Sequence, residues 1–170
     1  TSPKFLESLL ELEVPEIKDE MIKIVGSARI PGERAKIALS SLHPNIDAVG
    51  ATVGTKGVRI NAVSKELHNE NIDCIEYSNI PEIFIARALS PAIISNVKIQ
   101  NGKAIVTLPS DQKSKAIGKN GINIRLTSML TGFEIELVES GSSTVSAESS
   151  SHDDQPERDP NALKNLFGGL

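Results

Sequence analysis

Two short glycine loops contain the residue types in this sequence that are best suited to binding a ligand. Each has the pattern Gly-x-x-Gly, over residues 54–57 and 118–121. Because glycine has no side chain and tolerates positive φ, such a loop lets a ligand approach the backbone closely. A helix after the loop also offers unpaired N–H groups and the positive end of its dipole to a phosphate. The residues concerned are Gly54, Thr55, Lys56, Gly57, Gly118, Lys119, Asn120 and Gly121.

The two loops belong to an internal repeat. Residues 51–60 recur with conservative changes as residues 115–124, an offset of 64 positions. A lone Gly-x-x-Gly is usually an ordinary turn. Its repetition, each time with apolar residues at the same positions around it, predicts two copies of one fold.

The first copy is expected to begin with a helix, because Ser2 can cap it and Pro3 can open it. Strands rich in Ile, Val and Leu follow on both sides of a Pro-Gly turn, and an amphipathic helix follows the loop. The expected elements are a helix from residue 3, strands over 21–28 and 35–40, a helix after residue 57 and a strand over 72–77.

The second copy repeats this order. Pro81 opens a helix, which ends at Ser90 because a residue before proline avoids the helical region. Asn101 and Gly102 are the turn of a predicted hairpin. The expected elements are a helix from residue 81, strands over 93–99 and 104–108, a helix that Gly132 ends and a strand over 133–137.

These patterns predict an α+β protein in which a three-stranded sheet has helices packed on one face, twice over. The expected domains are residues 1–79, including an N-terminal junction helix, and residues 80–139. The acidic, Ser-rich residues 140–170 are expected to be a disordered tail. Within that tail, residues 159–167 are either a frayed end or a short helical docking motif.

The distribution of charge favours an anionic ligand although the net charge is −4. Between residues 29 and 125 there are 13 Lys and Arg against 8 Asp and Glu, while the acids gather at residues 7–20 and in the tail. The aromatic content is 3% and there is no Trp. An RRM, which stacks bases on exposed aromatic rings, is therefore disfavoured.

The single cysteine, Cys74, cannot form an internal disulfide and is expected to be a buried strand residue. No apolar stretch is long enough to cross a membrane, and the first residues have no secretory pattern. We therefore expect a cytoplasmic protein that does not contact a membrane.

An enzyme that binds nucleotide phosphates is the main alternative of another class. Neither loop continues into a P-loop, and neither forms the Gly-x-Gly-x-x-Gly of a dinucleotide site. The histidines His43, His68 and His152 lack the spacing of metal ligands. We expect no catalytic residue, no metal and no cofactor.

The repeated order of elements around Gly-x-x-Gly is typical of KH domains, in which the loop clamps about four nucleotides. Four stretches, residues 27–38, 46–54, 88–92 and 116–126, resemble the NusA family of bacterial transcription factors. The resemblance implies type II KH topology. It also implies a factor in transcription elongation, termination and antitermination that contacts nascent single-stranded RNA. We expect the chain to be a monomer. Family members reach RNA polymerase through N-terminal domains that are not in this sequence.

The predicted RNA-binding residues are the two loops together with residues at the start of the helices that follow, Arg59, Asn123 and Arg125. Arg29, Arg34 and Lys36 are further candidates, although ordinary solvated charge explains Arg29 and Lys36 equally well. A tandem KH module of an RNA-processing or ribosome-assembly protein is the alternative within the same class, because its binding physics would be the same.

Overall fold

The computed structural model describes residues 2–140 of the chain. The predicted tail and the predicted short helix of residues 159–167 therefore lie outside the described residues, apart from Ser140. No helix within the described part is both long and apolar enough to span a membrane.

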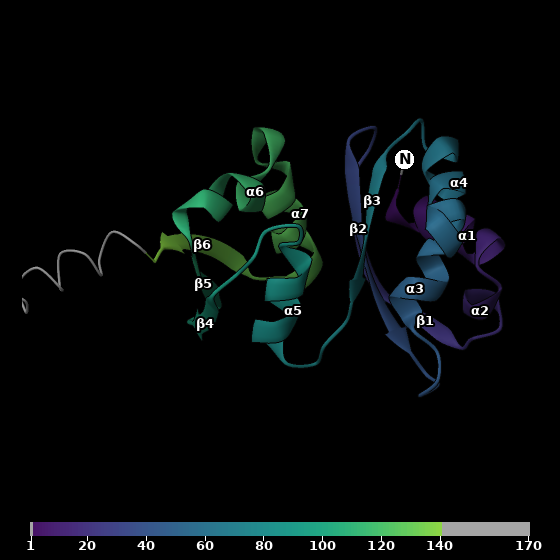
Figure 1. The fold of residues 1–170 in the computed structure, drawn as a ribbon, viewed down its shortest axis with the longest axis horizontal. Helices are drawn as coiled ribbons and strands as arrows, with labels where there is room; N and C mark the ends of the chain where they lie inside the picture. The colour runs from purple at the N-terminus through teal and green to yellow at the C-terminus, as the bar shows by residue number, and fades with distance from the viewer. Residues whose placement is uncertain (1, 141–170) are drawn as a thin grey trace, which may run out of the picture. The chain divides into compact units, whose positions relative to one another are not determined.

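The first half of the described chain forms a three-stranded sheet with helices on one of its faces (Figure 1). In the strand order β1-β2-β3, the first pair is antiparallel and the second parallel. A 3₁₀ turn over Thr55–Gly57 separates the two helices at the first loop. The elements are α1 (Pro3–Glu13), α2 (Pro15–Lys18), β1 (Ile22–Ile30), β2 (Arg34–Ser41), α3 (Ala48–Val53), α4 (Val58–Glu66) and β3 (Asn71–Glu76).

The second half repeats this arrangement, with the strand order β4-β5-β6 and an antiparallel first pair. A 3₁₀ turn at Lys119–Gly121 again separates the helices around the loop. The elements are α5 (Pro81–Ala88), β4 (Asn96–Gln100), β5 (Lys103–Leu108), α6 (Lys113–Ile117), α7 (Ile122–Thr131) and β6 (Glu134–Glu139), with a further 3₁₀ turn over Ser110–Gln112.

The predicted α+β class and the repeated element order are confirmed, including the helix end at Gly132 and the turn at Asn101 and Gly102. The four-residue helix α2 was not predicted, because it is too short to show a periodic pattern. Strand β4 begins at Asn96 and not at residue 93. The backbone N–H of Ile93 donates to Gln112 Oε1, so this residue belongs to a loop and not to the strand ladder.

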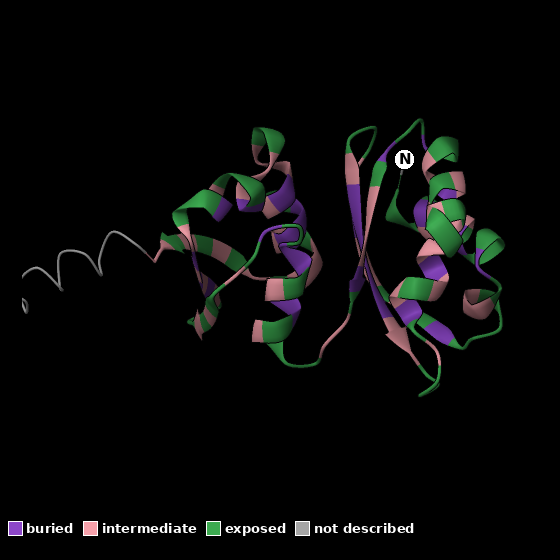
Figure 2. Ribbon diagram, viewed as in Figure 1, coloured by how far each residue is buried: buried purple, intermediate pink, exposed green. Residues whose placement is uncertain are grey.

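Each half has its own apolar core (Figure 2). Buried positions alternate with more exposed ones along β5, whereas residues 35–39 of β2 are all buried. In the first half, α1 and α4 contribute buried Leu and Val side chains against strand β2. In the second half, α5 packs against β5. The largest fully buried core members are Leu6, Leu10, Ile22, Ile37 and Leu39 in the first half, and Ile85, Leu89 and Leu108 in the second.

A third apolar cluster draws on both halves. Ala38 and Ile75 of the first sheet pack with Phe84 and Ala88 of helix α5, and Tyr77 and Leu130 lie against them. The rings of Tyr77 and Phe84 meet edge to face with centroids 5.0 Å apart. Helix α5 therefore contacts strand β3 of the first sheet as well as β4 and β5 of its own, and helix α7 contacts β1 and β2 of the first sheet.

Cys74 is a half-buried residue of strand β3. Burial, and then the negative charge of Asp73, raise the pKa of its thiol from 9.0 to about 12. The reactive thiolate is therefore scarce at neutral pH.

We predict that iodoacetamide alkylates Cys74 at least about a hundredfold more slowly in the native protein than in urea, because the thiolate forms only after burial is lost. Mass spectrometry of timed samples measures both rates. The control is the exposed position Ser114→Cys in a Cys74→Ala background, which should react quickly in both states. Equal native rates for the two cysteines would contradict the prediction.

Candidate nucleic-acid interface

The two Gly-x-x-Gly loops have the same backbone conformation. In each loop the first glycine has φ near +80° and the residue before the second glycine has φ near +55°. The latter residue is Lys56 in the first loop and Asn120 in the second. Asparagine adopts this left-handed conformation more readily than lysine does. The loop sequences thus differ while their geometry is retained.

A close contact explains why the first position of each loop is glycine. A Cβ atom at Gly54 would lie 2.9 Å from Cγ of Arg59, and one at Gly118 would lie 2.7 Å from Cβ of Asn123. Both distances are too short for carbon atoms. Any larger residue would have to move the helix that follows the loop.

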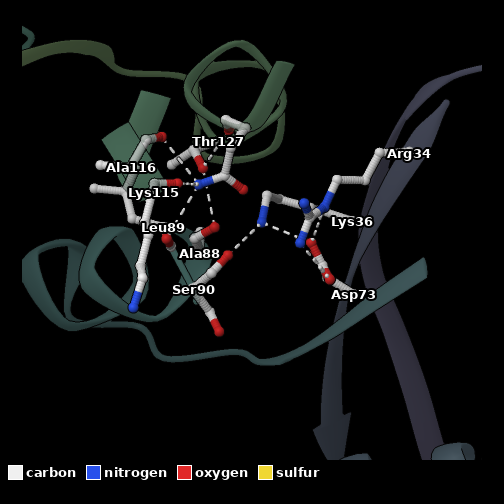
Figure 3. A network of polar contacts seen from close by, with 10 residues as sticks. Arg34, Lys36, Asp73, Ala88, Leu89, Ser90, Lys115, Ala116 and Thr127 are labelled. Atoms are coloured by element: carbon white, nitrogen blue, oxygen red, sulfur yellow. Dashed lines mark hydrogen bonds and ion pairs between the residues drawn. The ribbon is translucent and has the colours of Figure 1, made fainter. Parts of the chain in front are cut away.

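Arg59 and Asn123 occupy equivalent positions and brace the helix before their loop. Arg59 Nη1 donates to the carbonyl oxygen of Ala51 at 2.8 Å and to Glu16 Oε2 at 2.7 Å. Asn123 Nδ2 donates to the carbonyl oxygens of Lys115, Ala116 and Leu89 (Figure 3). In both copies, therefore, a side chain after the loop fixes the loop by donating to backbone carbonyl groups of the helix before it.

This bracing changes the expected role of one predicted site residue. Asn123 is 1% exposed and its amide nitrogen is occupied, so its donor group cannot reach a ligand in this conformation. Arg59 is partly exposed but is paired with Glu16. No sequence signal distinguished these two from solvent-facing polar residues, because their partners come from other elements.

The remaining predicted side chains face solvent. None of them has a hydrogen-bond or ion-pair partner within the described chain. They place three positive charges and two further donors at the loops and on helix α7. These exposed residues are Thr55, Lys56, Lys119, Asn120 and Arg125.

Two protein families match the chain in succession. The NusA-like first KH domain matches residues 1–77, and the NusA-like second KH domain matches residues 81–145. Each match contains one of the two loops.

The chain belongs to the NusA family.

The relatives agree with this assignment. The chain is 49% identical to the transcription termination/antitermination protein NusA of Helicobacter pylori, covering 98% of the chain and 48% of the relative. It is 47% identical to NusA of Thermus thermophilus, covering 80% of the chain and 36% of that relative. The chain thus spans about half the length, or less, of these curated relatives.

A solved structure shows the same fold at low sequence identity. The crystal structure of APE1850 superposes with a TM-score of 0.56 and 22% identity, covering 81% of this chain and 96% of the other. The type II KH pair expected from the sequence rests on the two family matches and on the repeated three-stranded sheets.

The paired KH domains of this NusA-family chain are joined by a polar network as well as by the third apolar cluster (Figure 3). Lys36 of strand β2 is fully buried, and its Nζ donates to Asp73 Oδ2 at 2.9 Å. The same Nζ donates to the carbonyl oxygen of Ser90, just after helix α5, at 3.0 Å. Arg34 donates to both oxygens of Asp73. One carboxylate therefore serves two cations.

The network also caps helix α5. The last carbonyl groups of a helix have no partner within it. The carbonyl oxygens of Ala88, Leu89 and Ser90 accept hydrogen bonds from Thr127, Asn123 and Lys36 respectively. Because a positive charge is favourable at a helix C-terminus, Lys36 contributes electrostatically as well as by hydrogen bonding.

Neither Arg29 nor Lys36, both weighed as RNA contacts, is accessible. The Arg29 side chain is 6% exposed and its Nε binds both carboxylate oxygens of Glu70. Lys36 is enclosed at the joint between the two KH domains. The sequence did contain a signal for Lys36, since a charged residue inside the apolar run of a central strand requires a specific partner.

Burial lowers the pKa of Lys36 below its usual 10.5, and the negative charge of Asp73 opposes this shift. The folded protein therefore releases this proton at a lower pH than the unfolded chain does. Where the unfolded chain binds more protons, stability rises with pH. The contribution of Lys36 to stability thus improves as the pH rises toward 10.5.

We predict that Asp73→Asn destabilises the protein by on the order of 3 kcal/mol near neutral pH, because it leaves buried Lys36 without a counter-ion. Lys36→Met should cost much less, since Arg34 still pairs with Asp73. Urea unfolding at several pH values measures both.

The loss caused by Asp73→Asn should shrink as the pH rises, because Lys36 can then lose its proton. The loss caused by Lys36→Met should not shrink in this way. Equal destabilisation by the two variants at every pH would show that the buried charge is not the controlling feature.

Proposed function

We propose that the chain binds single-stranded nascent RNA through its two KH loops, as part of a factor in transcription elongation, termination and antitermination. The observation that carries this proposal is the pair of equivalent loops whose exposed donors have no partner within the described chain. The names of the curated relatives support the transcriptional role.

The binding mechanism follows from the loop geometry. Positive φ at the glycines lets a phosphate approach the backbone, and the first turns of α4 and α7 direct N–H groups toward it. Lys56 and Lys119 add positive charge beside the same phosphates. Val58, 64% exposed directly after the first loop, and the half-buried Ile122 at the equivalent position offer apolar contact to a base.

The proposal includes no catalysis and no cofactor. Among residues 2–140 no group of three or more His, Cys, Asp or Glu side chains is placed to hold a metal ion. RNA polymerase is a partner through other regions of a longer protein, and the chain acts as a cytoplasmic monomer. Its domains are residues 1–79 and 80–139.

We predict that replacing Lys119 and Asn120 by Asp lowers the affinity for single-stranded RNA by more than about tenfold, because the new charges repel phosphate. Thr55→Asp with Lys56→Asp should act in the same direction. Fluorescence anisotropy with a labelled RNA measures the affinity.

The matched control is Lys98→Asp with Gln100→Asp. These exposed residues of strand β4 give the same change in charge as the second-loop variant but lie outside both loops. If the control weakened binding as much as the loop variant, net charge and not the loop would explain the effect.

We also predict that a 12-nucleotide RNA binds at least about tenfold more tightly than a 4-nucleotide RNA, because each loop clamps about four nucleotides and the two act on one strand. Only residues 77–80 separate β3 from α5, and apolar packing joins the two halves. Equal affinity for the two lengths in the parent protein would show that the loops act independently.

A further inference from the structure

A small polar pocket lies between the second loop and the first KH domain. Its walls are Glu33, Arg34 and Asn71 from the first domain and Gly118, Lys119 and Ile122 from the second. Asn123 also lines it, and the volume is about 130 Å³. The first domain therefore contributes side chains directly beside the phosphate-binding loop of the second.

The polar network between the two KH domains, formed by Arg34, Lys36 and Asp73, holds the first-domain wall in place. Arg34 Nε and Nη2 donate to Asp73 at 2.7 and 3.0 Å, which fixes the guanidinium. The backbone N–H of Asn71 donates to the carbonyl oxygen of Glu33, which places the start of β3 beside the turn after β1. Hydrogen bonds within the first domain thus fix the positions of Arg34 and Asn71 in the pocket wall.

The pocket has unused hydrogen-bonding capacity and a positive balance of charge. Asn123 is 1% exposed, and its Oδ1 is buried without a donor. The exposed Asn71 side chain has no partner within the described chain. Asp73 is shared by Arg34 and Lys36, so that group keeps a surplus positive charge. Lys119 adds one positive charge and Glu33 one negative charge.

The size of the pocket indicates what it can hold. Sites for free drug-sized molecules usually have volumes of about 300–1,000 Å³, so this pocket is smaller than a typical site of that kind. It suits part of one unit, such as a base or a phosphate, of a polymer that is held elsewhere. The second loop, which supplies its other wall, is the place where a strand would be held.

We propose that Arg34 and Asn71 of the first KH domain complete the RNA site of the second loop as a shared subsite for one nucleotide. The inference rests on the proposed RNA binding. Arg34 and Lys119 contact a phosphate of the strand, and the exposed amide of Asn71 meets the polar edge of a base. The second loop therefore requires the first domain for full affinity.

Asn71→Asp tests this subsite with little change in volume. The added charge should lower the affinity for a 12-nucleotide single-stranded RNA roughly five- to tenfold, because it opposes the phosphate. The matched control, Asn96→Asp, makes the same change at an exposed position of β4 and should alter affinity by less than about twofold.

A substitution of opposite sign strengthens the test. Glu33→Gln removes the negative charge of the pocket and should raise affinity roughly two- to fivefold. Its control, Glu66→Gln, makes the same change on helix α4 outside the pocket. Urea unfolding should show that all four variants are as stable as the parent.

A double-mutant cycle locates the effect. The loss caused by Asn71→Asp should become small when Lys119 and Asn120 are already Asp, and should persist when Thr55 and Lys56 are Asp instead. If Asn71→Asp matched Asn96→Asp while the parent bound RNA, the shared subsite would be overturned alone. If the parent bound no single-stranded RNA, the proposed function would fail as well.

Discussion

The interface depends on one close contact in each glycine loop. The first glycine of the loop packs directly against the residue five positions later. At Gly54 and Gly118 there is no room for a Cβ atom, since Arg59 and Asn123 lie less than 3.0 Å from where it would be. Positive φ and the absence of a Cβ atom at these two glycines let the next helix begin close to the loop. The two central side chains then point into solvent, where a strand can reach them.

The two copies satisfy this constraint with different side chains, and the difference ties each loop to different surroundings. The long Arg59 reaches out of the loop to Glu16 in helix α2, an element that has no counterpart in the second copy. The short Asn123 stays buried and reaches the end of helix α5 at Leu89. Lys36 caps the same helix end from the first domain. The second loop is thereby connected to the joint between the domains, and the first loop is not.

The sequence predicted the parts of this structure that local chemistry determines. Proline at helix starts, glycine at a helix end and the Asn-Gly turn have the same meaning in almost any context, and the repeat identified both loops. The roles of Arg29, Lys36 and Asn123 could not be derived in this way. Whether a polar side chain meets solvent or a buried partner depends on residues that are distant in sequence, such as Glu70 for Arg29 and Ser90 for Lys36.

These pairings also explain how a chain with a net charge of −4 can bind an anionic ligand such as RNA. Several acids pair with basic residues that hold the fold together: Glu70 pairs with Arg29, Glu16 with Arg59, and Asp73 with both Arg34 and Lys36. Lys56, Lys119 and Arg125 have no such partner within the described chain. Because exposed charges more than about 8 Å apart are largely screened at physiological salt, a phosphate at the loops experiences these unpaired groups more strongly than the net charge of −4. Local pairing, and not overall composition, therefore determines where this protein can attract RNA.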